Sequence, residues 1–195
     1  KSYFANYDIS EEQWFEDIRF VDGSTFNGKV DLFVGGSPCQ SFSTYGKRLG
    51  LEDTRGTLFY DYARLIKEVS PKVFIFENVK GLLSHDSGNT WEILKEKFSS
   101  LGYQICPKVL NAKDFGIPQH RERLFVVGFK EKNDFSFDLV KVPLKKATLR
   151  EVLHPEDGSE QPEEPYTIGD CAKVNPKYTL SDKLWAYLQS YAEKH

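Results

Sequence analysis

Three polar clusters in the sequence have the residue types of a catalytic site. The first surrounds Cys39, which follows Gly35, Gly36 and Pro38 at the end of a short apolar run. Glycines permit a tight turn and a close approach of the backbone to a ligand, and proline stiffens the chain before the thiol. A thiol on a loop beyond a strand is well placed for nucleophilic attack. A buried structural cysteine is the alternative, because free cysteines are commonly buried.

The second cluster is Glu77 with Asn78, at the end of the apolar run 73–76. Burial of that run would bring the Glu77 carboxyl group to a partly desolvated edge. Desolvation raises a carboxyl pKa, which suits a proton donor near neutral pH. The alternative is a carboxylate that caps the next turn.

The third cluster is the run 119–123, Gln-His-Arg-Glu-Arg, at the start of a predicted strand. In an extended chain Gln119, Arg121 and Arg123 point the same way. Two guanidinium groups and an amide on one side can grip a carbonyl, a carboxylate or a phosphate. A charged strand start that faces solvent is the alternative.

Alternating strands and helices are predicted around these clusters. The apolar patterns predict strands at 30–36, 72–79, 103–112 and 123–130, and helices at 56–69 and 90–100. Thr90 is expected to cap the second helix and Gly102 to end it. This order indicates an open α/β sheet, in which ligands bind beyond the carboxyl ends of the strands.

Composition places the chain among globular proteins and excludes several other classes. Of 195 residues, 39% are hydrophobic and 28% charged, which excludes collagen, coiled coil and wholesale disorder. No apolar run is long enough for a membrane helix, and no signal-peptide pattern is present. Cys39, Cys106 and Cys171 lack the spacing of a disulfide framework or a zinc ribbon, so we expect no metal and a reducing, intracellular setting.

Charge is distributed unevenly toward the C-terminus. Residues 104–150 carry ten Lys or Arg and five Asp or Glu, whereas residues 151–165 carry six acids and no Lys or Arg. Such asymmetry can mark a face for a polyanion, and two ordinary solvated faces are the alternative. Residues 154–170 are rich in proline and acids and predict a surface linker. A terminal amphipathic helix is predicted over 181–194, with Ser181 as its cap.

Taken together, the clusters form ordered motifs: Pro38-Cys39-Gln40, Glu77-Asn78-Val79 and Gln119-x-Arg121-x-Arg123, with Asp53-Thr54-Arg55-Gly56-Thr57-Leu58-Phe59 between the first two. They resemble the signature blocks of the cytosine-C5 DNA methyltransferases. The gaps of 38 residues from Cys39 to Glu77 and 44 from Glu77 to Arg121 are also like those of compact bacterial members. The resemblance covers roughly residues 15–130.

The resemblance implies an α/β fold of the Rossmann-like, S-adenosylmethionine-dependent methyltransferase type. Its sheet is doubly wound and mostly parallel, with an antiparallel C-terminal strand, and incomplete at both ends. Residues 1–150 would form a partial catalytic domain, and residues 151–195 an acidic linker and helix leading toward a missing target-recognition domain. The implied setting is a restriction-modification system in the bacterial cytoplasm, at the nucleoid.

The resemblance also implies a mechanism and its residues. The methyl donor is S-adenosylmethionine, and the substrate is a cytosine flipped out of double-stranded DNA. Cys39 would attack cytosine C6, Glu77 would hold the N3 and N4 edge, and Arg123 would bond the O2 carbonyl. Arg121 would support charge near the thiolate. Because C6 is a weak electrophile, an activated thiolate with ring protonation is an economical route.

Further positions carry over from the family to this chain. Those implied for the donor are Asp17, Ile18, Pro38 and Leu58, although Glu16 stands where the family usually has glycine. Those implied for DNA are Gln40, Ser43, Arg55, Asn78 and Gln119.

Other family parts are missing. These are the first Phe-x-Gly-x-Gly donor block, the acidic residue that meets the ribose, the target-recognition domain and the Asn-bearing block that follows it. The chain also lacks methionine. We therefore expect a processed, cut or partial polypeptide, or one subunit of a split enzyme with a complementing partner, inactive by itself. No oligomeric state is predicted.

Three other functions remain open at this point. A cysteine hydrolase would pair Cys39 with His85 or His120, but it leaves Glu77 and the two arginines without roles. A non-catalytic DNA-binding relative would not need the intact set of catalytic residues. A tRNA cytosine-C5 methyltransferase of the same family would use the same residues on another nucleic acid.

Overall fold

The computed structural model describes residues 2–37, 57–144, 147–153, 159–169 and 172–194. The chain divides into two compact units, residues 1–146 and residues 147–195. The catalytic and linker roles expected for the two parts of the chain stay predictions.

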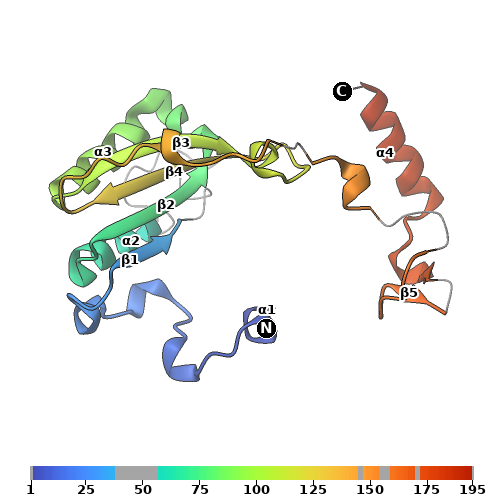
Figure 1. The fold of residues 1–195 in the computed structure, drawn as a ribbon, viewed down its shortest axis with the longest axis horizontal. Coiled ribbons are helices and arrows are strands. Elements are labelled where there is room, and N and C mark those ends of the chain that lie inside the picture. The colour runs from blue at the N-terminus through green and yellow to red at the C-terminus, as the bar shows by residue number, and fades with distance from the viewer. Residues whose placement is uncertain (1, 38–56, 145–146, 154–158, 170–171, 195) are drawn as a thin grey trace. The chain divides into compact units, whose positions relative to one another are not determined.

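The first unit is built on a four-stranded sheet that carries two long helices (Figure 1). Its helices and strands in chain order are α1 (Ser2–Asn6), β1 (Leu32–Gly35), α2 (Thr57–Val69), β2 (Val73–Val79), α3 (Asn89–Ser100), β3 (Gln104–Asn111) and β4 (Glu122–Phe129). Each strand and helix predicted for this unit is present, with both ends within two residues of the predicted limits.

The order of strands in the sheet is β1-β2-β4-β3. β1 pairs with β2 in parallel, and β4 is antiparallel to both of its neighbours. Three strands therefore run the same way and β4 runs against them. The parallel register sets Gly35 opposite Phe76, so the carboxyl ends of β1 and β2 lie at one edge of the sheet.

Aromatic side chains fill the core between the sheet and the helices. Phe98 of α3 packs against Phe74 of β2 and against Phe59 of α2, with ring centroids 4.6 and 5.5 Å apart. Because Phe59 also contacts Phe76 on the same face of β2, both helices cover that face. Burying a phenylalanine side chain stabilises a fold by about 1.5–3 kcal/mol. The described residues thus supply one of the two helical layers of a doubly wound sheet.

Gly128 of β4 lies opposite Phe74, and the Phe74 ring covers it. A Cβ atom at residue 128 would lie 2.0 Å from that ring. We expect Gly128→Ala to lower the free energy of unfolding by about 2–3 kcal/mol, the cost of overpacking a core. Urea unfolding measures the change. Gly81→Ala is the control, because nothing lies within 4 Å of a Cβ atom there; equal midpoints for the two variants would contradict the prediction.

The start of α3 differs from the prediction. The helix begins at Asn89, and the preceding Gly88 has a left-handed φ of 91° and gives no side-chain cap. The Thr90 hydroxyl lies 2.6 Å from Nδ1 of His85, so the predicted Thr90 cap is wrong. Gly102, with φ of 85°, follows the end of the helix as predicted.

The second unit contains the antiparallel pair β5 (Thr167–Ile168) and β6 (Lys173–Val174), followed by α4 (Asp182–Lys194). The Ser181 hydroxyl accepts a hydrogen bond from the backbone N–H of Leu184 at 3.4 Å, which confirms the predicted cap. No described residue of this unit is buried, and the apolar side chains of α4 are exposed. In the described part of the chain, no helix has the length and apolar character to cross a membrane.

Candidate active site

Two of the predicted catalytic residues meet at the carboxyl end of β2. Arg123 lies opposite Val79 in the antiparallel ladder, so Arg123 and Glu77 share one face of the sheet, two positions apart. The Arg123 Nε atom lies 3.0 Å from Glu77 Oε1. This ion pair joins β2 to β4 at the sheet edge where β1 also ends.

Glu77 lies at a partly exposed edge of the sheet. Its side chain is 42% exposed and is paired with the Arg123 guanidinium group. The cap alternative is wrong, because the next turn, Lys80–Leu83, has Val79 at its N-cap and no side-chain cap. Glu77 therefore presents a solvent-accessible carboxylate that Arg123 orients.

Arg121 and Gln119 are placed differently from Arg123. β4 begins only at Glu122, so the predicted strand alternation of Gln119, Arg121 and Arg123 is wrong. The backbone N–H of Arg121 donates to the Asn111 side chain at 3.1 Å, and the side chains of Arg121 and Gln119 are exposed. The structure brings Arg123 to Glu77 and leaves the other two facing solvent.

Asn78 lies on the core face of β2 and is 3% exposed. Its Nδ2 atom donates to the backbone oxygen of Ser37 at 3.0 Å, and its Oδ1 atom accepts from the N–H of Val79 at 2.9 Å. Ser37 is buried and precedes Cys39 by two residues. Asn78 thus fixes the point from which the chain continues toward Cys39.

Gly36 allows β1 to end directly against Glu77. A Cβ atom at residue 36 would lie 2.3 Å from the Glu77 backbone oxygen and 3.4 Å from its Oε2 atom. In the longest natural polypeptide that contains this sequence, we expect Gly36→Ala to displace Glu77 and to lower by about 100-fold any activity that depends on its carboxylate, since misplacement by 1 Å can cost that much. Unfolding should become easier by about 1–3 kcal/mol. Steady-state kinetics beside Gly81→Ala test this; wild-type kcat/KM in a folded Gly36→Ala protein would contradict it.

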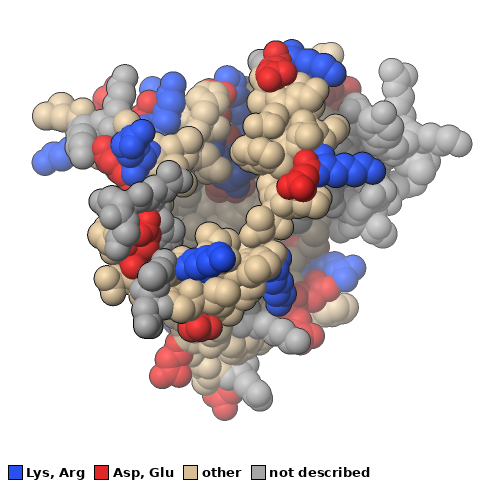
Figure 2. Space-filling model, turned by 90° about the vertical axis from the view of Figure 1, so that its right-hand side faces the viewer, with Lys and Arg blue, Asp and Glu red and all other residues tan. Residues whose placement is uncertain are grey.

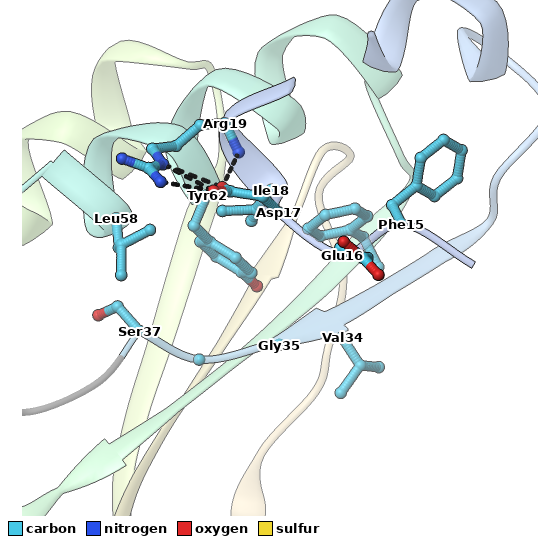
Figure 3. Close-up of a pocket in the computed structure, with 12 residues that line it drawn as sticks. Phe15, Glu16, Asp17, Ile18, Arg19, Val34, Gly35, Ser37, Leu58 and Tyr62 are labelled. Atoms are coloured by element: carbon cyan, nitrogen blue, oxygen red, sulfur yellow. Dashed lines mark hydrogen bonds and ion pairs between the residues drawn. The ribbon is translucent and has the colours of Figure 1, made fainter. Parts of the chain in front are cut away.

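A cavity of about 690 Å³ opens beside this edge, between the end of β1, the start of α2 and the segment 15–19 (Figure 3). Figure 3 shows Leu58 and Tyr62 reaching from α2 toward the stretch from Val34 to Ser37. The residues that line it are Phe15, Glu16, Asp17, Ile18, Arg19, Phe33, Val34, Gly35, Gly36, Ser37, Leu58 and Tyr62. Three of the four residues implied for the donor, Asp17, Ile18 and Leu58, therefore lie in one lining.

Asp17 and Arg19 form a tight ion pair at the cavity wall. Arg19 Nε donates to both Asp17 oxygens at 3.0 Å, and Nη2 lies 2.5 Å from Oδ2. Hydrogen bonds from the Arg19 side chain and backbone lower the pKa of Asp17 to about 2, so the carboxylate is ionised at neutral pH.

Tyr62 lines the cavity from α2. Its hydroxyl donates to the Ile75 backbone oxygen at 3.0 Å, and burial raises the pKa of the hydroxyl.

This lining fits the adenosine part of a nucleoside donor. Phe33, Ile18 and Leu58 supply apolar surface of the kind that a purine ring covers. The ionised Asp17 can accept a hydrogen bond from an exocyclic amino group. Gly35 keeps the strand end close to Tyr62, because a Cβ atom there would lie 2.9 Å from the ring.

Other predicted site residues fall outside the described part of the chain: Pro38, Cys39, Gln40, Ser43 and Arg55.

Arg64 was not predicted from the sequence. The feature that could have pointed to it is the i,i+4 spacing of Arg64 and Glu68, which form an ion pair on α2. Asn111, whose side chain accepts a hydrogen bond from the backbone N–H of Arg121, was not predicted either. Among the described residues, no group of three or more His, Cys, Asp or Glu is arranged to hold a metal ion.

Comparison with known proteins decides the family. Residues 1–195 match the family of C-5 cytosine-specific DNA methylases over the whole chain. This chain belongs to the C-5 cytosine-specific DNA methylases. The predicted family is therefore confirmed.

Curated relatives of this C-5 methylase chain include methyltransferases of bacteria and phages. It is 50% identical over 131 residues to the orphan methyltransferase M.SPRI of Bacillus phage SPR, covering 67% of this chain and 30% of the phage enzyme. It is 41% identical over 192 residues to the Type II methyltransferase M.SsoII of Shigella sonnei, covering 95% of this chain and 44% of that enzyme. The chain thus spans less than half the length of either relative.

The fold of the methylase chain is also similar to a solved structure. A crystal structure from E. coli, described as a DNA modification methyltransferase encoded within a prophage, superposes with a TM-score of 0.58 at 27% identity. The match covers 72% of this chain and 41% of the solved one. The predicted Rossmann-like methyltransferase fold, with a mostly parallel sheet, is confirmed.

Proposed function

We propose that this chain carries the catalytic centre of a DNA (cytosine-5-)-methyltransferase. The observation that carries the proposal is the Glu77–Arg123 ion pair at the sheet edge where β1 ends. Cys39, the proposed nucleophile, follows the buried Ser37 by two residues in the sequence. Asn78, the neighbour of Glu77 in β2, donates a hydrogen bond to the Ser37 backbone oxygen.

In the proposed mechanism the Cys39 thiolate adds to C6 of a flipped-out cytosine, and the electron pair of the C5–C6 bond makes C5 nucleophilic. Glu77 hydrogen-bonds the N3 and N4 edge and shares a proton at N3, while Arg123 donates to O2. S-adenosylmethionine, when bound, supplies the methyl group that C5 takes. Removal of the C5 proton by a base returns the electron pair to the C5–C6 bond and expels Cys39. Arg121 supports the charge near the thiolate.

Donor binding is assigned to Asp17, Ile18, Leu58 and Pro38. The ionised Asp17 carboxylate would accept from the adenine amino group, and Ile18 and Leu58 would cover the ring. This assignment is supported by the cavity, because Asp17, Ile18 and Leu58 all lie in its lining.

Double-stranded DNA is the proposed partner, with a restriction-modification role in the bacterial cytoplasm, at the nucleoid. Contacts to DNA are assigned to Gln40, Ser43, Arg55 and Gln119, whereas Asn78 would act through Ser37. On the face in Figure 2 the described Lys and Arg are mixed with Asp and Glu, which gives that face no single sign of charge. The proposal that the substrate is DNA is supported by the family to which the chain belongs, the C-5 cytosine-specific DNA methylases.

A covalent trap tests the proposed function. The longest natural polypeptide that contains this sequence is mixed with S-adenosylmethionine and duplex DNA carrying 5-fluorocytosine. Fluorine cannot leave C5 as the proton does, so the adduct persists and mass spectrometry locates it. We expect the adduct on Cys39. No adduct on a pool of mixed-sequence DNA, with donor binding demonstrated, would overturn the DNA proposal, and an adduct on tRNA would identify the alternative substrate.

Residues 1–195 by themselves are expected to transfer no methyl groups. The family's first donor block and its target-recognition domain are not part of this sequence, so donor and DNA would both be held weakly. Transfer of labelled methyl groups to mixed-sequence duplex DNA measures this, with the longer natural polypeptide as the positive control. Turnover by residues 1–195 alone would refute it.

A further inference from the structure

Arg64 lies on α2 and binds the segment that forms one wall of the cavity. Its Nη2 atom donates to the backbone oxygen of Ile18 at 2.9 Å, and its Nη1 atom donates to the backbone oxygen of Val21 at 2.9 Å. Those two residues bracket one 3-10 turn, in which the Val21 N–H donates to the Ile18 oxygen at 3.3 Å. One guanidinium group therefore binds both ends of the turn that follows Asp17.

Glu68, one helical turn further on, completes the attachment. Its Oε1 and Oε2 atoms accept from Arg64 Nη1 at 3.0 and 2.9 Å, and Oε2 also accepts from the backbone N–H of Gly23 at 2.9 Å. Gly23 is buried, and a Cβ atom there would lie 3.0 Å from Glu68. The Asn27 amide donates to the Glu68 backbone oxygen at 2.7 Å. The segment 18–27 is thus fixed to α2 along its length.

Arg64 does not line the cavity, so it can act on a ligand only through the wall that it holds. The wall contributes Asp17 and Ile18, whereas α2 contributes Leu58 and Tyr62 from the other side. The distance between the two walls depends on how firmly segment 18–27 is attached to α2. Lysine has a single nitrogen and cannot make the two forked contacts of a guanidinium group.

We propose that Arg64, oriented by Glu68, is a positioning residue that sets the affinity of the cavity for the adenosine part of the methyl donor. The inference rests on the proposed function of the cavity. It assigns Arg64 to donor binding and not to the chemistry at Glu77 and Arg123. We call the contacts of Arg64 and Glu68 with segment 18–27 the clamp. Loss of the clamp removes the guanidinium donors from the Ile18 and Val21 oxygens and lets the Asp17 wall shift.

The test compares Arg64→Lys, Arg64→Met and Glu68→Gln with wild type, in the longest natural polypeptide that contains this sequence. Lys67→Met is the control, because Lys67 is an exposed cation on the same helix. Titration calorimetry gives the Kd for S-adenosylmethionine, and kinetics give the donor KM and kcat. We expect Arg64→Lys and Arg64→Met to raise Kd and KM about tenfold or more, Glu68→Gln to raise them less, and kcat at saturating donor to stay within about twofold.

The possible results separate failure of the clamp from failure of the proposed donor site. Wild-type Kd in a folded Arg64→Lys protein would overturn the clamp, as would a fall in kcat with unchanged KM. A thermal unfolding midpoint measured beside each Kd separates loss of fold from loss of affinity. If Arg64→Met does not fold, Arg64→Lys and Glu68→Gln still decide. No donor binding by wild type would overturn both the donor assignment and the clamp, whereas equal binding by wild type and variants would overturn the clamp alone.

Discussion

Replacing Cys39 with alanine is expected to abolish methyl transfer to cytosine. Without the thiolate, no bond forms at C6 and C5 does not become nucleophilic. Removal of a covalent nucleophile lowers kcat by several powers of ten in enzymes that depend on one, so we expect a loss of at least about 10⁴-fold. Transfer of labelled methyl groups from S-adenosylmethionine to duplex DNA by the longest natural polypeptide that contains this sequence measures the loss, and the 5-fluorocytosine adduct should disappear with it.

Cys106 offers the matched control for the Cys39 variant. It is a free, partly buried thiol in β3, paired across the ladder with Val127 of β4 and remote from the Glu77–Arg123 pair in the register. Cys106→Ala should retain transfer within about twofold of wild type, because only a small side chain is lost. Transfer by Cys39→Ala above the level without enzyme would contradict the nucleophile assignment, as would loss of activity in Cys106→Ala without loss of fold.

Replacing Glu77 with glutamine is expected to give the second large loss. Glutamine keeps the size of the side chain but removes the carboxylate that shares a proton at N3 and orients Arg123. General acid–base groups contribute about 10²–10⁴-fold, so kcat/KM should fall by roughly 10³-fold. Because Glu77 is 42% exposed, loss of its ion pair should change the unfolding free energy by no more than about 1 kcal/mol.

Glu122 provides the control for Glu77, since both are partly exposed glutamates in ion pairs of 3.0 Å on the same sheet. Glu122 pairs with Lys80. The hydrogen bond and the charge of Lys80 lower the pKa of Glu122. In the described structure the Glu122 carboxylate does not contact Arg123, which donates instead to the Glu122 backbone oxygen. Glu122→Gln should keep kcat/KM within about threefold. Equal losses in the two variants would show that the carboxylate at Glu77 has no special role.

The elements of the first unit could be predicted because their patterns are strong. β2 begins with the continuous apolar run 73–76, which follows Pro71-Lys72 and precedes the polar pair Glu77-Asn78, and α2 places apolar side chains at helical spacing. Both signals come from neighbours in the chain. The start of α3 was misplaced because Gly88 adopts a left-handed conformation there and Thr90 bonds to His85 instead of capping the helix.

The site was predictable in its residue types but not in its contacts. Sequence motifs identified Glu77 and Arg123, yet only the antiparallel register of β2 and β4 shows that they pair. The hydrogen bond from Arg64 to Ile18 joins residues 46 positions apart in the sequence, and that from Asn78 to Ser37 joins residues 41 positions apart. Contacts at that separation depend on tertiary packing, which no local pattern records.

β1 pairs with β2 along one side only, and none of the described residues pairs with its other side. Its Leu32 and Val34 side chains are 52% and 63% exposed. An uncovered strand edge with apolar side chains is a template for further strands. A preparation of residues 1–195 should therefore self-associate more strongly as its concentration rises. The extent of self-association will depend on what covers that edge of β1. The exposed ion pair between Lys72 and Asp31 at the start of the strand provides charge there that opposes such growth.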